Sequence, residues 1–149
     1  FRNDLLDFVN KITLYNYDGD EDNKVMKINN KQISWLYNGD VEWNKQEGQS
    51  TIKCIYLIYK MQTSKNKNFV IKHNTLSSAR EFINQMESII YHKNNKMIIS
   101  NSNWSKTQST LINKKTNCKL FIASKKSKGI KGVDIHETVD DVWIDNGKG

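Results

Sequence analysis

The chain has 149 residues, a length at which one domain buries a core without disulfides or a structural metal. Its hydrophobic content of 37% and charged content of 26% exclude a disordered chain, and no apolar run approaches the roughly 18 residues that cross a bilayer. The formal net charge of +7 is the compositional feature that indicates a polyanionic partner.

The basic charge has a second explanation. Lysine, asparagine and isoleucine abound, proline is absent, and arginine occurs only at Arg2 and Arg80, which is typical of a genome of very low G+C content. Arginine is the preferred residue for bidentate contacts with phosphates and base edges, so this composition disfavours specific readout of a nucleic acid. The charge therefore indicates either codon bias or sequence-tolerant contact with phosphates.

The first quarter of the chain predicts short elements around an acidic turn. Arg2 to Tyr17 fits either a short helix that runs into a strand or an extended segment throughout. Asp18 to Asn23 has the D-x-D-x-D spacing with which a calcium loop starts, but its glycine is misplaced and Asn29 stands where the loop needs glutamate. We expect a solvated hairpin tip there, followed by a strand from Val25 to Ile28.

The next segment predicts a hairpin and then a central strand. Gln32 to Tyr37 is expected to be a strand, and Asn38-Gly39 favours a type I′ turn that returns along Val41 to Trp43. Thr51 to Met61, with the sequence TIKCIYLIYKM, is apolar at both odd and even positions. That pattern predicts a strand covered on both faces.

Thr75 to His92 is the one long amphipathic helix that the sequence predicts. Its apolar residues recur at the i, i+3, i+4, i+7 spacing of a helix with one buried face, and we expect Ile83, Met86 and Ile90 to be buried. Thr75 and Ser78 offer oxygens to its first turn, and Ser78 with Glu81 has the form of a capping box.

The remaining strands are predicted to be short, and together with the helix they define the fold class. We expect an α+β fold in which a mainly antiparallel sheet of short strands packs on one principal helix at about residues 75–92. Residues 1–149 form one domain, as a whole protein or a fragment of a larger one, with a strand-rich part at 110–149. The further strands are expected at Phe69 to Lys72, Lys96 to Ser100, Thr110 to Asn113, Lys119 to Ser124, Val133 to His136 and Val139 to Ile144.

The two cysteines are expected to be reduced and buried, because Cys54 and Cys118 both lie in apolar runs of a chain without a secretory signal. Neither cysteine stands at metal-ligand spacing from the other or from His73, His92 and His136. A metal site built from these side chains is therefore not predicted.

The stretch from Gln32 to Ser105 resembles a known family. QISWLYNGDVEW, TIKCIYLIYK, SSAREFINQMESII and NKMIISNSNW follow the order of the N-terminal, substrate-side domain of the mitochondrial AAA chaperones that translocate folded Rieske protein, and of their relatives in large DNA viruses. The resemblance rests on Tyr37, Gly39, Trp43 and Trp104 and covers about half the chain. It implies a shared topology, and no ATPase activity carries over to this chain, since the G-x4-G-K-[ST] loop of the family's ATPase module is missing.

The C-terminal stretch GIKGVDIHETVDDVWIDNGKG is the most enzyme-like part of the sequence. It resembles the PD-(D/E)XK metal-dependent nucleases, in which acidic residues bind magnesium and a lysine follows the second acidic residue at a fixed spacing. Asp134, Asp145 and Lys148 are the candidate catalytic residues. The lysine is one residue late and Asn146 occupies the required acidic position, so we expect no cleavage.

The sequence thus leaves two classes of function open. The first is a non-enzymatic protein-interaction or assembly module of a larger protein or complex, intracellular, with a protein partner or a second copy of itself and no cofactor. The second is a nucleic-acid-binding domain, with magnesium only if it is a degenerate nuclease, whose contacts are made by Lys125, Lys126, Lys128 and Lys131. If their segment is a strand, Trp35 and Tyr37 share one face of it. The two rings then form either a layer of the core or a platform on which bases stack.

Overall fold

The computed structural model describes residues 2–14, 24–39, 41–107, 109–124 and 134–140. In this part of the chain the α-helices are α1 (Arg2–Lys11), α2 (Asn30–Asn38), α3 (Gln49–Thr63) and α4 (Leu76–Ile90), and the 3-10 helices are η1 (Lys93–Asn95) and η2 (Asn101–Asn103). The strands are β1 (Thr13–Leu14), β2 (Lys24–Val25), β3 (Asn68–His73), β4 (Trp104–Lys106), β5 (Thr110–Asn113), β6 (Cys118–Ser124) and β7 (Glu137–Asp140).

The main sheet is mixed and has the strand order β4-β5-β6-β3-β7. Strands β4, β5 and β6 pair antiparallel, whereas β3 lies parallel to both β6 and β7, with Asn68 opposite Lys119 and Phe69 opposite Glu137. Strands β1 and β2 form a separate antiparallel pair. Three of the five pairings among the described strands are antiparallel, and the predicted α+β class is confirmed.

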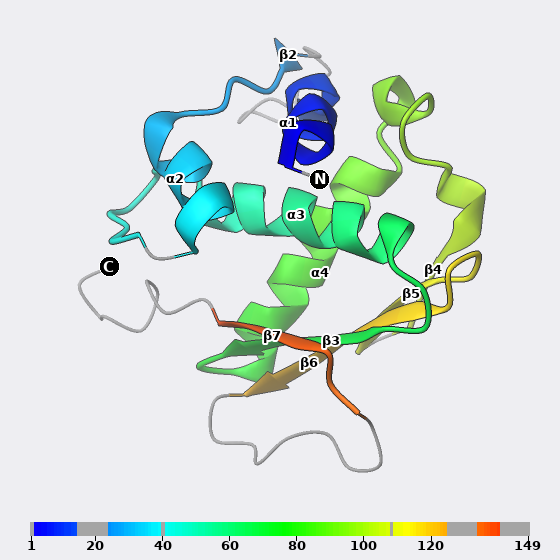
Figure 1. Cartoon of the computed structure of the whole chain (residues 1–149). Helices are drawn as coiled ribbons and strands as arrows, with labels where there is room; N and C mark the ends of the chain where they lie inside the picture. Colours follow the sequence, from blue (N-terminus) through cyan, green and yellow to red (C-terminus); the bar gives the residue numbers. More distant parts are fainter. Residues whose placement is uncertain (1, 15–23, 40, 108, 125–133, 141–149) are drawn as a thin grey trace.

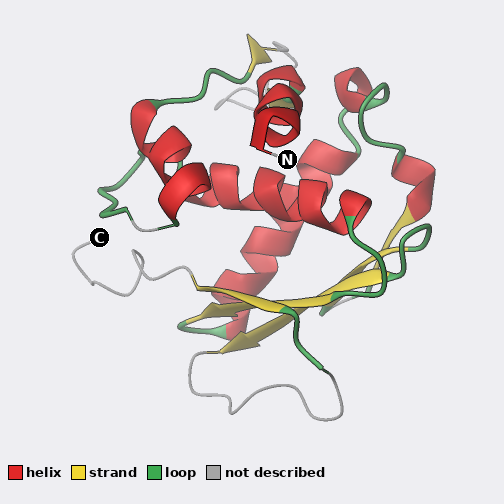
Figure 2. Cartoon of the chain, viewed as in Figure 1, coloured by secondary structure: helices red, strands yellow, loops and turns green. Residues whose placement is uncertain are grey.

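The helices gather on one side of the sheet, where they enclose the core (Figure 2). Helices α3 and α4 pack on each other and on the sheet, and α1 packs on α3 through Phe8 and Tyr59, whose ring centroids lie 5.4 Å apart. None of the helices in the described ranges is long and apolar enough to cross a membrane. Cys54 and Cys118 are free thiols and buried, as predicted.

Helix α4 confirms the prediction for Thr75 to His92. Ile83, Met86 and Ile90 are at most 2% exposed, and full burial of such a side chain contributes roughly 1.5–3 kcal/mol. The N-cap is Thr75, whose Oγ1 accepts a hydrogen bond from the backbone N–H of Ser78 at 3.1 Å. The helix therefore begins one turn before the capping box that Ser78 and Glu81 would form.

The predicted hairpin and central strand are wrong, because both segments are helical. Gln32 to Tyr37 lies in α2, and the Asn38-Gly39 pair ends that helix: Gly39, at φ 69°, donates its N–H to the carbonyl oxygen of Trp35 at 2.8 Å. Thr51 to Met61 lies in α3, which is surrounded by α1, α2, α4 and the sheet. A helix buried on nearly every side shows the same unbroken apolar run as a central strand.

Three further boundaries differ from the predictions. Val41 to Trp43 and Lys96 to Ser100 form no strand, and the second of these segments is the turn between η1 and η2. The last strand of the described chain is β7, preceded by an irregular stretch at 134–136 where a separate strand was expected. Arg2 to Tyr17 starts as helix α1 and continues as β1, while residues 15–23, with the acidic turn, lie outside the described residues.

Candidate functional site

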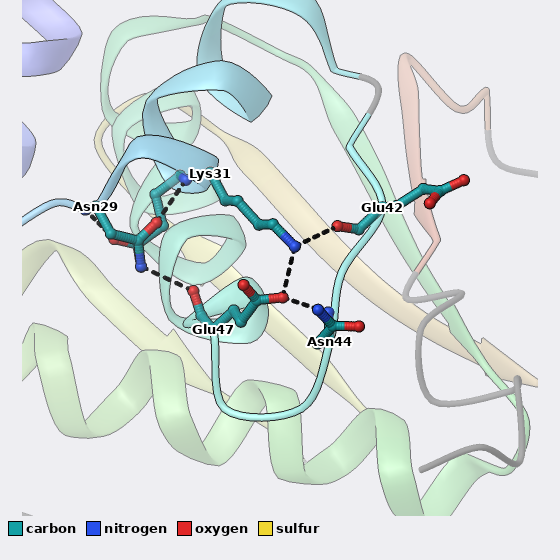
Figure 3. A network of polar contacts seen from close by, with 6 residues as sticks. Asn29, Lys31, Glu42, Asn44 and Glu47 are labelled. Carbon is teal, nitrogen blue, oxygen red and sulfur yellow. Dashed lines mark hydrogen bonds and ion pairs between the residues drawn. The ribbon is translucent and has the colours of Figure 1, made fainter.

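The loop that joins α2 to α3 is tied to α2 by the polar network in Figure 3. Nζ of Lys31 lies 2.7 Å from Oε1 of Glu47 and donates to the carbonyl oxygen of Glu42 at 3.0 Å. The same Glu47 oxygen accepts a hydrogen bond from the backbone N–H of Asn44, and Nδ2 of Asn29 donates to the carbonyl oxygen of Glu47 at 2.9 Å. The loop therefore has a fixed path up to the residue that precedes α3.

The environment of Glu47 lowers the pKa of its carboxyl group. The hydrogen bond from Lys31 is the largest cause, and the backbone hydrogen bond from Asn44 adds to it. The two side chains of the pair are 37% and 28% exposed, so water screens their attraction. The ion pair thus adds little to the free energy of folding, and its main effect is to fix the geometry of the loop.

Gly48 is the residue at which this loop becomes helix α3. Its φ of 81° is left-handed, and a Cβ there would meet Nε2 of Gln32 well inside the 3.0 Å that real Cβ contacts respect. That Nε2 donates to the carbonyl oxygen of Gly48 at 2.9 Å, and the same side chain completes the capping box of α2 with Asn29. Glycine is required here both for the backbone conformation and for the close approach of Gln32.

The amino terminus of α3 has no side-chain cap. The first N–H groups of a helix lack an intrahelical partner and carry the positive end of the helix dipole, so an uncapped start attracts anions. Gln49, the first residue of α3, is 5% exposed, and its Oε1 has no hydrogen-bond partner. Because an amide oxygen only accepts hydrogen bonds, an anion at this helix start would be bound by the backbone N–H groups and not by Oε1 of Gln49.

The start of α3 lies toward the carboxyl edge of the parallel strands. The turn before β3 is short, and Thr116, just ahead of β6, donates its hydroxyl to the carbonyl oxygen of Met61 near the end of α3 at 2.6 Å. The end of α3 is thus at the amino edge of the sheet, and the helix runs back along β3 and β7 (Figure 1). Helix α4 begins directly after β3 at this edge, where ligands bind in open sheets with parallel strands. The start of α3 lies farther along α4, because Oγ1 of Thr51 accepts a hydrogen bond from Nε2 of Gln85 at 3.0 Å.

Tyr56 fixes the height of α3 relative to β7. Its hydroxyl donates a hydrogen bond shared between the two carboxylate oxygens of Glu137, at 2.9 and 3.1 Å. This hydrogen bond places the middle of α3 next to the first residue of β7.

Aromatic side chains of α2 and α3 pack on each other, and of the two alternatives left open by the sequence, a core layer or a stacking platform, Trp35 follows the first. Trp35 meets Tyr56 edge to face at 5.1 Å, and Nζ of the buried Lys53 lies 5.8 Å from the ring centroid of Trp35. Residues two apart on a helix point in different directions, so Trp35 packs on the core while Tyr37 is 44% exposed. The shared face predicted for these two residues is wrong.

The predicted nuclease residues are only partly described. Asp134 is exposed, and its carbonyl oxygen accepts a hydrogen bond from Nδ2 of Asn68, the first residue of β3. It therefore lies at the amino edge of the sheet, away from the start of α3. Asp145 and Lys148 lie outside the described residues, as do Lys125, Lys126, Lys128 and Lys131. Within the described ranges no three His, Cys, Asp or Glu side chains lie close enough together to hold a metal ion.

Sequence reasoning missed the start of α3. Gly48-Gln49-Ser50 carried a usable signal, a glycine and a polar residue ahead of a long apolar run, which is how a helix after a tight turn begins. Assigning the apolar run to a strand hid that signal, because a strand has no amino-terminal set of free N–H groups.

The fold has a relative among solved structures. A crystal structure of the large terminase of bacteriophage HK97 matches with a TM-score of 0.73 at 11% sequence identity, over 93% of this chain and 30% of that chain. At this identity the likeness establishes the fold alone, and the chain spans less than a third of the length of that protein's chain. No family model and no curated protein matches the sequence.

Proposed function

We propose that this chain is a module of a larger, large-terminase-like protein and that it binds phosphate groups at the carboxyl edge of β3, β6 and β7. The observation that carries the proposal is the uncapped start of α3, whose first N–H groups are free to donate to an anion. The likeness to the phage terminase supports a place in a larger protein, since the match covers 30% of that chain.

The start of α3 resembles a phosphate-binding loop that has lost its lysine. In the pattern G-x4-G-K-[ST] the lysine reaches the outer phosphates of a nucleotide and the hydroxyl holds magnesium. Here Gly48, Gln49 and Ser50 stand where the pattern has glycine, lysine and serine, and Trp43 stands in place of its first glycine. Glutamine is neutral, so we propose phosphate binding without efficient hydrolysis, which agrees with the expected non-enzymatic role.

A nucleic-acid role would use the same edge. Strand β6 ends there at Ser124, and the segment with Lys125, Lys126, Lys128 and Lys131 follows directly in the sequence. Four lysines within seven residues would neutralise several phosphates without reading bases. The phosphate at this edge therefore belongs either to a nucleotide or to a nucleic-acid backbone, and protein partners would come from the rest of the larger protein.

Restoring the lysine tests the nucleotide source. Gln49→Lys places a cation at the helix start, and it is expected to tighten binding of ATP to the chain at least about tenfold by calorimetric titration, since a desolvated charge-assisted contact is worth roughly 1.5–3 kcal/mol. The matched control, Gln46→Lys, adds the same charge at an exposed position of the same loop and is expected to change binding less than about threefold.

A second arm tests the nucleic-acid source. Replacing Lys125, Lys126, Lys128 and Lys131 with glutamine is expected to weaken binding of a labelled duplex at low salt and to leave ATP binding unchanged. Equal effects of Gln49→Lys and Gln46→Lys on ATP, together with unchanged duplex binding in the four-lysine variant, would contradict phosphate binding at this edge.

A further inference from the structure

Two turns lie side by side at the amino edge of the sheet, opposite the start of α3. Residues 64–67 connect α3 to β3, and residues 114–117 connect β5 to β6. The backbone N–H of Asn66 donates to the carbonyl oxygen of Thr116 at 2.9 Å, and that of Lys119 donates to the carbonyl oxygen of Lys67 at 3.0 Å. The parallel ladder of β3 and β6 thus extends into the turns and makes them neighbours.

Side chains fix the shape of both turns. Oδ1 of Asn113 accepts hydrogen bonds from the backbone N–H groups of Lys115 and Thr116, each at 3.1 Å. Nδ2 of Asn117 donates to Oδ1 of Asn66 at 2.9 Å, and both of these asparagines hold left-handed backbone angles, φ 57° and 56°. Asparagine tolerates that conformation better than most residues, so the turns form a preorganised surface.

This surface is basic, and we call it the amino-edge lysine patch (Lys65, Lys67, Lys114 and Lys115). All four lysines are exposed, and none forms an ion pair with a described residue. Elsewhere Lys31 pairs with Glu47 at 2.7 Å and Lys106 with Glu87 at 3.1 Å. The charge of the patch is therefore not neutralised by the described part of the chain.

The sequence around the patch is free of acidic residues over long stretches. No Asp or Glu stands between Glu47 and Glu81, or between Glu87 and Asp134. The fold brings Asp134 to the border of the patch, through the hydrogen bond from Asn68. A surface on which four lysines collect beside a single carboxylate, that of Asp134, carries a positive potential that attracts polyanions.

We propose that the amino-edge lysine patch contacts the phosphate backbone of a nucleic acid. The turns consist only of serine, threonine, asparagine and lysine, which are side chains that donate to phosphate oxygens. A protein interface would need aromatic, arginine or apolar anchors at its centre, and the two turns contain none. The site lies on the edge opposite the phosphate site proposed above and acts whether or not that site is occupied.

The test compares two triple variants of equal charge. Lys65→Gln, Lys67→Gln and Lys115→Gln together remove three charges from the patch, and Lys11→Gln, Lys27→Gln and Lys96→Gln remove three from exposed positions elsewhere. Each variant lowers the net charge of +7 by three, to +4, so the control measures the effect of charge alone. Affinity for a short labelled duplex is measured over a range of salt concentrations.

The patch variant is expected to lower the slope of log affinity against log salt by about 2.7, which is 0.9 for each of three lost phosphate contacts, and the control by less than about 1. Asp134→Asn is expected to tighten binding, because it removes a negative charge from the border. Equal slopes for the two triple variants, or no duplex binding by the unchanged chain at low salt, would overturn the proposal. Titrations of the same proteins with ATP test the proposed phosphate site at the carboxyl edge separately.

Discussion

Gly48→Ala probes the geometry at the start of α3. A side chain at φ 81° is disfavoured by roughly 1–2 kcal/mol, as for any left-handed L residue. The new Cβ would also displace Gln32, which is 3% exposed and donates from Nε2 to the carbonyl oxygen of Gly48. Losing that hydrogen bond costs about 1 kcal/mol, so we expect destabilisation by about 2–3 kcal/mol in total.

Gly39→Ala is the matched control, because Gly39 is also left-handed, at φ 69°, but has nothing within 4 Å of where its Cβ would stand. The gain from a less flexible unfolded chain is common to both variants and cancels in their difference. Urea unfolding followed by circular dichroism should therefore show Gly48→Ala to be less stable than Gly39→Ala by about 1 kcal/mol, because both variants share the cost of the left-handed angle and only the first loses the hydrogen bond.

A double variant identifies the source of that difference. In a Gln32→Ala background the crowding at Gly48 is relieved, so Gly48→Ala should cost no more there than Gly39→Ala does in the unchanged chain. If Gly48→Ala is no more destabilising than Gly39→Ala to begin with, the tight approach of Gln32 to the start of α3 is refuted.

Two further predictions concern a buried amide and an ion pair. Asn95 is fully buried and binds the backbone N–H and carbonyl oxygen of Thr13, at 2.8 and 3.1 Å, so Asn95→Ala should cost roughly 2–3 kcal/mol and the exposed Asn94→Ala under about 0.5 in urea unfolding. The pKa of Glu47 is lowered from 4.5 by Lys31, so its stabilisation is present above that value and is lost as pH falls through the lowered pKa. The stability difference between the unchanged chain and Glu47→Gln should accordingly shrink as the pH falls below 4.5; a difference that stays constant at every acidic pH would contradict the ion pair.

The sequence predicted those elements whose burial is one-sided. Helix α4 shows a polar face at Arg80, Glu81 and Asn84 and a buried face at Ile83 and Met86, so its period is plain. Helix α3 has no such contrast between a polar and a buried face, since even its lysine, Lys53, is buried with only 5% exposed. Its β-branched and aromatic residues favour a strand when taken alone.

The site was harder to predict than the fold because it depends on contacts between distant segments. The pairing of Asn68 with Lys119 makes β3 and β6 parallel and brings the start of α4 and the ends of these strands to one edge, and no local pattern encodes that pairing. The need for glycine at position 48 arises from Gln32, sixteen residues earlier. By contrast, the lysines of the patch are plain in the sequence, and only their meeting across two turns required the structure.

The most direct test of phosphate binding at the carboxyl edge is a titration of the isotope-labelled chain with inorganic pyrophosphate, followed through its backbone amide signals. An uncapped helix start binds anions through its first N–H groups, so the largest and saturable shifts are expected at Gly48, Gln49, Ser50 and Thr51. Saturable shifts confined to other parts of the chain, or none at these four residues, would contradict the account.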